Sequence, residues 1–268
     1  MELLLSSISI NLMYKKITYS QIKEFLEEKT ELYLRPNFIS EDPISIPHHF
    51  NKKEDIEIAA FLSSTIAWGR RSMILKNAER MMEIMDYSPH DFVLHASNNE
   101  IDKSLSFCHR TFQGIDFQTF ILGLRNIYQN HNGLETCFHT KNEDMSEGIA
   151  NFKKVFFSIK HPKRSEKHIS NPLNGSAAKR LIMFLRWMVR SNKEGVDFGI
   201  WKSLKPNQLS CPLDVHTANV GRKLGLIKRK ANDWKTVKEL DYHLRNFCPE
   251  DPAKYDFALF GLGVYEKF

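Results

Sequence analysis

Apolar residues recur at helical spacing along most of this chain of 268 residues, and that periodicity limits its fold more than any other feature. Residues three and four positions apart share one face of a helix, so the pattern predicts helices over about 20–34, 54–67, 71–86 and 116–130. No stretch alternates apolar and polar residues between the turn signals of a hairpin. The sequence therefore predicts an all-α protein in which strands are minor.

Two segments outside these helices carry turn and aromatic residues. Residues 35–50 contain prolines and histidines and are predicted to form a loop, which follows a helix that Ser20 can cap. Residues 191–208 have the composition of an inserted loop. Its Phe198 and Trp201 are too apolar to be left in solvent, so we expect this loop to fold back onto the protein. There it forms either a wall of the ligand pocket or a packed surface segment, and the packed segment is the expectation.

The length and composition indicate one compact unit with a basic surface. A chain with 42% hydrophobic residues can bury a full core as one large domain or as two packed lobes. We expect residues 1–268 to form a single unit of two helical lobes, with the active cleft between an N-terminal lobe and a central lobe. The formal net charge of +6 fits a polyanionic partner, although many basic proteins have none.

The scattered cysteines and the lack of a long apolar run lead us to expect a cytoplasmic protein. The four cysteines are scattered without a C-x-x-C pair, as in proteins with reduced thiols. Residues 1–12 have an apolar patch but lack the basic start and cleavage site of a signal peptide, and Met13 is an alternative start. No apolar run reaches the roughly eighteen residues that cross a bilayer, so we expect no membrane partner.

Two short segments hold the residues with the clearest chemical potential. A glycine-containing turn, residues 173–178, leads into an apolar helix with Lys179 in its first turn. Thirty-five residues later (214 − 179), Asp214 stands just ahead of another helix. An amine and a carboxylate brought together can act as a nucleophile and its partner, and helix starts bind phosphate through backbone amides. Together they suggest chemistry on a nucleic-acid sugar.

Four segments in the same order resemble the helix–hairpin–helix (HhH-GPD) DNA glycosylase superfamily. Its hairpin, usually L-P-G-V-G-x-K, is matched by LNGSAAK at 173–179, and the segment of its catalytic aspartate by PLDVHTANVGRKLGL at 212–226. An early helix of endonuclease III relatives is similar to residues 58–78, and the helix before the iron–sulfur cysteines of some members to residues 255–263. The motifs PLDVHT and KYDFALFGLGV also resemble those of an uncharacterised bacterial family.

This resemblance implies a two-lobed helical glycosylase fold, with the hairpin at about 171–190 and the aspartate segment at about 211–226. It implies a bifunctional DNA glycosylase with AP-lyase activity, which removes a damaged base from duplex DNA through a lysine Schiff base. Lys179 would attack the sugar, and Asp214 would stabilise its positive charge as the base departs. Burial and the neighbouring Arg180 would favour the neutral, nucleophilic form of the lysine.

Contacts to duplex DNA are implied at two places. The backbone amides of the hairpin, helped by the side chain of Arg180, would bind phosphate; they belong to Gly175, Ser176, Ala177 and Ala178. The other place is the sequence where relatives insert a wedge into the duplex, here Trp68 with Arg70 and Arg71. These residues either contact DNA or form a core tryptophan with flanking charges. His216 either orders the helix start or contacts the nucleic acid.

The chain departs from the superfamily pattern at several positions. Asn174 replaces the hairpin proline and Ala177 the second glycine, so the turn is expected to lose rigidity and backbone freedom. Thr65 stands where relatives carry a wedging glutamine. The lysine–aspartate separation is longer than in the commonest members and closer to that of archaeal 8-oxoguanine DNA glycosylases.

No metal or cofactor is expected. His48 and His49 adjoin in a loop, and His161 and His168 have no partner at the usual ligand spacing. The sequence stops at Phe268, where the iron–sulfur loop of endonuclease III would begin, so no cluster is expected. We expect a monomer.

Two other classes of function fit the same residues. One is a non-catalytic scaffold that binds DNA or structured RNA, which the altered hairpin favours and the retained Lys179 and Asp214 oppose. The other is a metabolic enzyme that acts on a free nucleoside or another small molecule in the same cleft. The metabolic enzyme needs no phosphate contacts, so it should show no salt-sensitive DNA binding. Both the glycosylase and the non-catalytic scaffold should show such binding.

Overall fold

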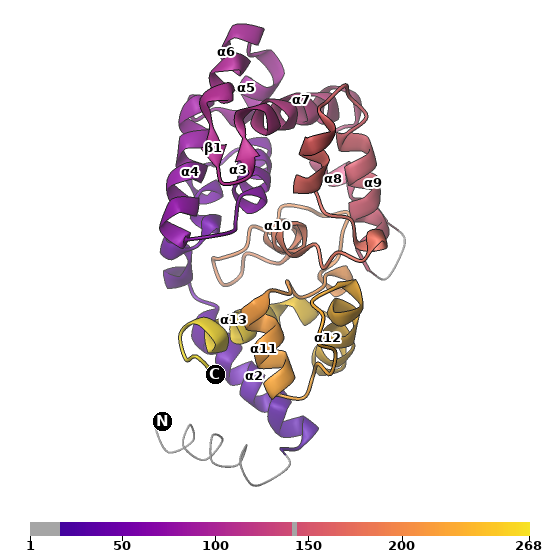
Figure 1. Cartoon of the computed structure of the whole chain (residues 1–268). Helices are drawn as coiled ribbons and strands as arrows, with labels where there is room; N and C mark the ends of the chain where they lie inside the picture. Colours follow the sequence, from indigo (N-terminus) through magenta and orange to yellow (C-terminus); the bar gives the residue numbers. More distant parts are fainter. Residues whose placement is uncertain (1–16, 141–143) are drawn as a thin grey trace.

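The computed structural model describes residues 17–140 and 144–268, which are mostly helical and contain only two short strands (Figure 1). The all-α prediction is confirmed. The alternative start at Met13 lies outside the described residues. Among the helices that the structure describes, none combines the length and the apolar character needed to cross a bilayer.

The described helices lie between residues 19 and 264 and follow one another along most of the chain. The α-helices are α2 (Tyr19–Tyr33), α3 (Lys53–Thr65), α4 (Arg71–Ile84), α5 (Pro89–His95), α6 (Asn98–Asp102), α7 (Gly114–Asn130), α8 (Leu134–Cys137), α9 (Ser146–Phe156), α10 (Lys179–Val189), α11 (Val215–Lys223), α12 (Trp234–Phe247) and α13 (Asp256–Val264). The 3₁₀ helices are η1 (Pro36–Glu41), η2 (Pro43–Ser45), η3 (Pro47–His49), η4 (Lys103–Ser106), η5 (Lys163–His168), η6 (Pro172–Asn174), η7 (Pro206–Gln208) and η8 (Pro252–Tyr255). Strands β1 (Cys108–His109) and β2 (Phe112–Gln113) pair in antiparallel register.

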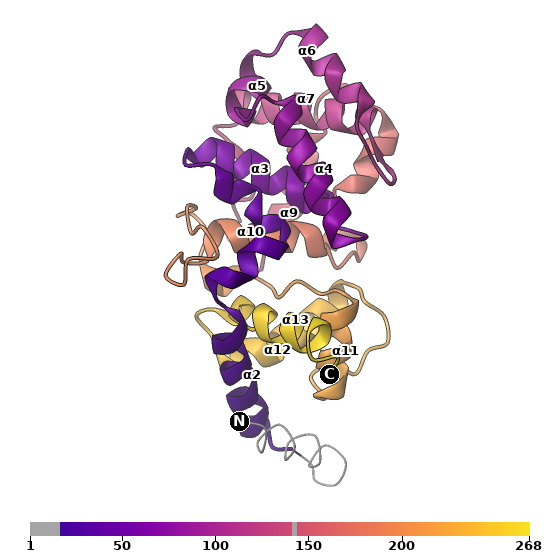
Figure 2. The same ribbon diagram turned by 90° about the vertical axis from the view of Figure 1, so that its left-hand side faces the viewer.

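Two groups of helices lie on either side of α10 (Figures 1 and 2). Helices α3 to α9 and the β-hairpin form one group, and α2, α11, α12 and α13 form the other. The second group joins the two ends of the chain, since Lys29 Nζ of α2 lies 2.7 Å from Glu266 Oε1 beyond α13. Helix α2 packs on α13, and its Tyr19 ring lies 4.6 Å from that of Phe247 on α12, so this group combines segments from near both ends of the sequence.

The four predicted helices are present, with bounds shifted by one or two residues. Helix α2 is capped by Thr18, whose hydroxyl oxygen accepts a hydrogen bond from the Gln21 amide, so Ser20 is not the cap. Residues 35–50, predicted as a loop, form the three short 3₁₀ helices η1, η2 and η3. Each begins with a proline, whose fixed φ suits the first position of a helix. Such short pieces are too brief to show a hydrophobic period.

An aromatic core fixes α10 against α3 and α9. The ring of Phe61 on α3 lies 5.7 Å from that of Phe184 on α10. Two rings of α9 complete the contact, with centroids 5.4 Å (Phe152) and 5.5 Å (Phe156) from Phe61. All four side chains are fully buried. This packing holds the start of α10 in place, where the candidate lysine stands.

The inserted loop 191–208 folds back onto the protein, as predicted. The indole Nε1 of Trp201 donates a hydrogen bond of 2.6 Å to Glu57 Oε1, and the ring is fully buried. Phe198 packs on His48 with ring centroids 4.4 Å apart. The loop is therefore a packed segment that lies against α3 and α10.

Candidate functional site

The turn before α10 places Lys179 at the first position of that helix. Gly175 ends η6 with a left-handed φ of 86°, and Ala178, the residue before the helix, is also left-handed with φ 47°. The Trp234 amide donates to the Gly175 carbonyl oxygen at 3.0 Å, which ties the turn to the start of α12. Ala177 does not adopt a positive φ, so the missing second glycine costs the backbone nothing at that position.

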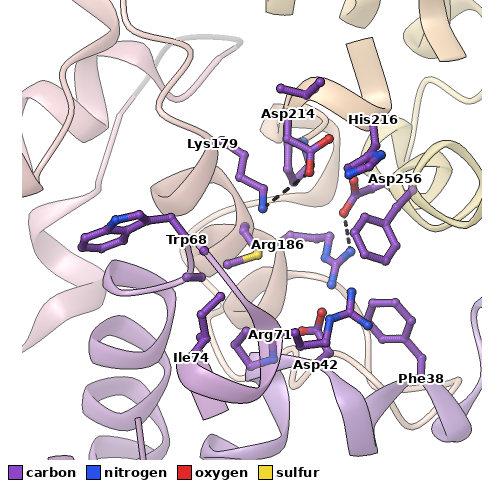
Figure 3. Close-up of a pocket in the computed structure, with 17 residues that line it drawn as sticks. Phe38, Asp42, Trp68, Arg71, Ile74, Lys179, Arg186, Asp214, His216 and Asp256 are labelled. Atoms are coloured by element: carbon purple, nitrogen blue, oxygen red, sulfur yellow. Dashed lines mark hydrogen bonds and ion pairs between the residues drawn. The ribbon is translucent and has the colours of Figure 1, made fainter. Parts of the chain in front are cut away.

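Asp214 caps α11, and its two carboxylate oxygens have different tasks. Oδ1 accepts a hydrogen bond of 2.9 Å from the Thr217 amide, as expected for an aspartate at a helix start. Oδ2 lies 3.7 Å from Lys179 Nζ. The predicted pairing of the two candidate residues is therefore confirmed by the geometry, and Figure 3 shows their side chains directed toward one another.

The pair stands at the edge of a pocket of about 400 Å³. This volume lies in the range of small-molecule sites in proteins. The pocket lies between the two groups of helices, and its lining comes from η1, η2, the α3–α4 connection, α4, α10, α11 and α13: Phe38, Asp42, Pro43, Ala67, Trp68, Gly69, Arg71, Ile74, Lys179, Met183, Arg186, Pro212, Asp214, Val215, His216, Asp256 and Phe260. No residue of the 191–208 loop lines it, so the loop is not a pocket wall.

The inner wall of the pocket holds buried charges in pairs. Arg186 Nη1 lies 2.5 Å from Asp256 Oδ2 (Figure 3). Arg186 Nε lies 3.4 Å from Asp197 Oδ1 of the inserted loop. Burial raises the pKa of Asp256 to about 6, although the nearby Arg186 acts in the opposite direction. Burial also raises the pKa of Asp42, while the Ile44 amide that donates to it acts in the opposite direction. The wall thus offers both hydrogen-bond donors and acceptors to a ligand.

The backbone amides of the turn are largely used within it. Gly175 N donates to the Pro172 carbonyl oxygen at 2.8 Å, Ser176 N to that of Asn171 at 3.4 Å, and Ala178 N to Ser176 Oγ at 3.2 Å. Three of the four amides that the sequence suggested for phosphate are therefore already hydrogen-bonded. The first amides of a helix lack intrahelical acceptors, so a phosphate would be held mainly by the start of α10 itself.

Arg180 does not face outward as the sequence suggested. Its guanidinium donates to the carbonyl oxygens of Thr65 and His168 and lies 4.7 Å from the centre of the Trp68 ring. Burial lowers the pKa of Arg180 to about 10. The side chain of a residue in the first turn of a helix can point to solvent or into the protein. Here a cation–π contact and two carbonyl oxygens hold the Arg180 side chain in the protein interior. Arg180 therefore joins α10 to the end of α3.

The remaining predicted residues are divided between the pocket and its rim. Trp68 is half-buried and lines the pocket, so it is not a fully enclosed core residue, and its contact with DNA stays a prediction. Arg71 also lines the pocket, with its guanidinium 5.4 Å from the ring of Phe260, whereas Arg70 is exposed at the start of α4. His216 lines the pocket from the exposed side of α11. Lys179 keeps 30% of its side chain exposed, so it is less buried than the sequence suggested.

Sequence reasoning missed the buried charges of the inner wall. Asp42 lies far from both motifs in the sequence, and Arg186 lies within the apolar helix α10. A charged residue within a run as apolar as α10 was the available signal, because such residues are buried only when paired. In residues 17–140 and 144–268, no three His, Cys, Asp or Glu side chains are grouped so that they could hold a metal ion. All four cysteines are free thiols.

Comparison with known proteins gives one family. Residues 42–265 match the family described as "Protein of unknown function (DUF2400)". The chain belongs to this family. No curated protein and no solved structure matches it. The match extends over the whole pocket except Phe38, so the DUF2400 region contains both Lys179 and Asp214.

The left-handed turn of this DUF2400 chain leads to a stability prediction. Replacing Gly175 by alanine should lower the free energy of unfolding by about 1 kcal/mol, because an L-residue is disfavoured at φ 86°. Nothing lies within 4 Å of the added Cβ, so no clash contributes. The same change at Gly225, φ 74° and equally open, is the matched control and should cost a similar amount. Urea denaturation measures both, and an unaffected Gly175→Ala would contradict the strain.

A second prediction for this DUF2400 chain concerns pH. Burial lowers the pKa of His168 to about 4, although Asp116 Oδ2 at 3.4 Å opposes the shift. The unfolded histidine takes up its proton near pH 6.5, before the folded one does. The stability from this group is therefore present above pH 6.5 and is lost as the pH falls through about 4. Relative to His168→Gln, the wild type should lose about 3 kcal/mol over that window in urea denaturation. A constant difference between the two proteins would refute the assignment.

Proposed function

We propose that this protein is a DNA glycosylase with lyase activity that removes a damaged base from duplex DNA. The observation that carries the proposal is the approach of Lys179 Nζ to Asp214 Oδ2, 3.7 Å apart at the edge of a pocket. An amine and a carboxylate that are both partly exposed can supply the nucleophile for attack on a sugar and the negative charge that stabilises the sugar cation. The four-segment resemblance to helix–hairpin–helix glycosylases supports the same reading.

In the proposed reaction, the ammonium group of Lys179 loses a proton to solvent, and Asp214 stays ionised. The neutral amine attacks C1′ of a nucleotide that has been rotated out of the duplex, the bond from C1′ to the base breaks, and the base leaves with the bonding electrons and takes up a proton from water. The carboxylate Oδ2 stabilises the positive charge on the sugar during this step. The resulting amine adduct opens to a Schiff base, and loss of a C2′ proton expels the 3′ phosphate.

The pocket suits a flat heterocycle. Phe38, Trp68 and Phe260 supply aromatic surface, and Arg186 with Asp256 supplies polar groups at the inner wall. Enzymes that act on a flipped base combine stacking with hydrogen bonds to the base edge. In this proposal, the base enters the pocket past Lys179, and the sugar stays at the rim between Lys179 and Asp214.

Duplex DNA is the proposed partner, bound by a monomer in the cytoplasm. The net charge of +6 favours a polyanion, and Arg70 and Arg71 flank the connection next to Trp68. The start of α10 would hold a phosphate through its first amides and its dipole. The affinity should therefore fall steeply as the salt concentration rises.

Borohydride trapping tests the proposal. The full-length protein is incubated with duplexes that carry an abasic site, 8-oxoguanine or uracil, and sodium borohydride reduces any Schiff base to a stable adduct. We expect a covalent protein–DNA band with the abasic duplex and with the duplex whose base is removed. Tight, salt-sensitive DNA binding without any adduct or excision would favour the non-catalytic scaffold. Absence of DNA binding would favour a small-molecule enzyme.

A further inference from the structure

The short β-hairpin of β1 and β2 is an unusual feature of a protein that is otherwise helical. It pairs Cys108 with Gln113 and His109 with Phe112, so its turn is Arg110 and Thr111. Among the described residues it is the only sheet. Neither the two superfamily motifs nor the pocket accounts for it.

The hairpin is anchored to the pocket's edge. Asn77 Nδ2 donates a hydrogen bond of 2.8 Å to His109 Nδ1, and His109 Nε2 donates one of 3.1 Å to the carbonyl oxygen of Trp68. Phe112 is fully buried against the rings of Phe120 and His168. The hairpin therefore has a fixed position beside Trp68, a lining residue of the pocket.

The turn presents an arginine in a strained conformation. Arg110 is exposed and has a φ of 55°, a region that costs a residue with a side chain about 1–2 kcal/mol. Its side chain lies across Gly69, since Cδ and Nη1 are each 3.2 Å from the position that a Cβ would take there. An asparagine or a glycine would fit this turn better, so packing does not explain the arginine.

Two exposed arginines adjoin Gly69: Arg110, whose side chain lies against it, and Arg70, which follows it in the sequence. In residues 17–140 and 144–268, neither guanidinium takes part in an ion pair or a hydrogen bond. The neighbouring Arg164 differs, because it lies 3.2 Å from Asp116 and is neutralised there. Two exposed, uncompensated guanidiniums beside a glycine and an aromatic ring can approach a phosphate backbone closely.

We propose that Arg110 and Arg70 form a phosphate clamp that holds the DNA backbone at the mouth of the pocket beside Trp68. The clamp rests on the proposed function for its partner, and it adds a contact from the hairpin that the helix–hairpin–helix elements do not provide. The anchored hairpin fixes the backbone of Arg110 beside Gly69 before DNA binds, so only the side chain has to be ordered on binding.

The salt dependence of DNA binding tests the clamp. Fluorescence anisotropy gives the affinity of the full-length protein for a duplex with a non-cleavable abasic-site analogue at several salt concentrations. Each lost phosphate contact lowers the slope of log affinity against log salt by about 0.9. Arg110→Asn should reduce the slope by that amount without lowering the melting temperature, because asparagine tolerates the left-handed turn. Arg110→Lys should keep the slope.

Controls separate this inference from the proposed function. Lys193→Gln removes one charge from the exposed inserted loop, away from the pocket, and should leave the slope unchanged. Wild-type binding with an unchanged slope in Arg110→Asn would overturn the clamp and leave the proposed function standing. A wild type that binds no duplex DNA, or binds single-stranded RNA instead, would overturn both.

Discussion

Replacing Lys179 by glutamine is expected to abolish borohydride trapping completely. Glutamine keeps nearly the length of lysine but has no amine to form a Schiff base. Lys179 Nζ contacts Asp214 at 3.7 Å and remains 30% exposed, so the fold should tolerate its loss. DNA affinity should change only a few fold, because one charge among several contacts is removed.

A matched variant controls for the loss of a lysine at a helix start. Lys235 is exposed in the first turn of α12 and does not line the pocket, so Lys235→Gln should be trapped as efficiently as the wild type. Gel analysis with an abasic duplex compares the three proteins. Trapping of Lys179→Gln at the wild-type level would remove Lys179 from the chemistry.

Asp214→Asn is expected to slow base excision by about a hundredfold or more, which corresponds to about 2.7 kcal/mol in the barrier. The amide oxygen can still accept the Thr217 hydrogen bond that Oδ1 accepts now, at 2.9 Å. Asparagine caps helices about as well as aspartate, so the melting temperature should stay near that of the wild type. What is lost is the negative charge of Oδ2, which faces Lys179.

An aspartate-to-asparagine change at another helix cap serves as the control. It shows whether excision slows because the pocket loses a negative charge or because any helix start loses one. Asp233 caps α12 and accepts from the Thr236 amide at 3.0 Å, but it does not line the pocket. Asp233→Asn should therefore excise at nearly the wild-type rate. Single-turnover kinetics on the duplex identified by trapping gives both rates, and equal rates for Asp214→Asn and the wild type would end its catalytic assignment.

The positions of Lys179 and Asp214 at two helix starts could be predicted from sequence because both residues depend on local signals. Asp214 stands where a helix cap is favoured, and Lys179 follows a turn with Gly175 at a left-handed position. Such signals act over a few residues, so they can be read from the sequence. The family resemblance then indicated that the two helix starts meet.

The rest of the pocket depends on contacts between distant segments. Asp42 and Asp256 reach the inner wall because α2 and η2 fold back toward α13, which no local pattern encodes. The direction of Arg180 was missed for a related reason, since the carbonyl oxygens of Thr65 and His168 that hold it become neighbours only in the folded chain. Arg110 was missed because a strand of two residues has no period to detect.

Peptide mapping of the trapped adduct shows directly whether Lys179 is the residue that attacks the sugar. The full-length protein is trapped on an abasic duplex with borohydride, digested with protease and nuclease, and analysed by mass spectrometry. We predict that the reduced sugar remnant is attached to Nζ of Lys179, in a peptide from the start of α10. Attachment to another lysine or to the terminal amine, with Lys179 unmodified, would contradict the account.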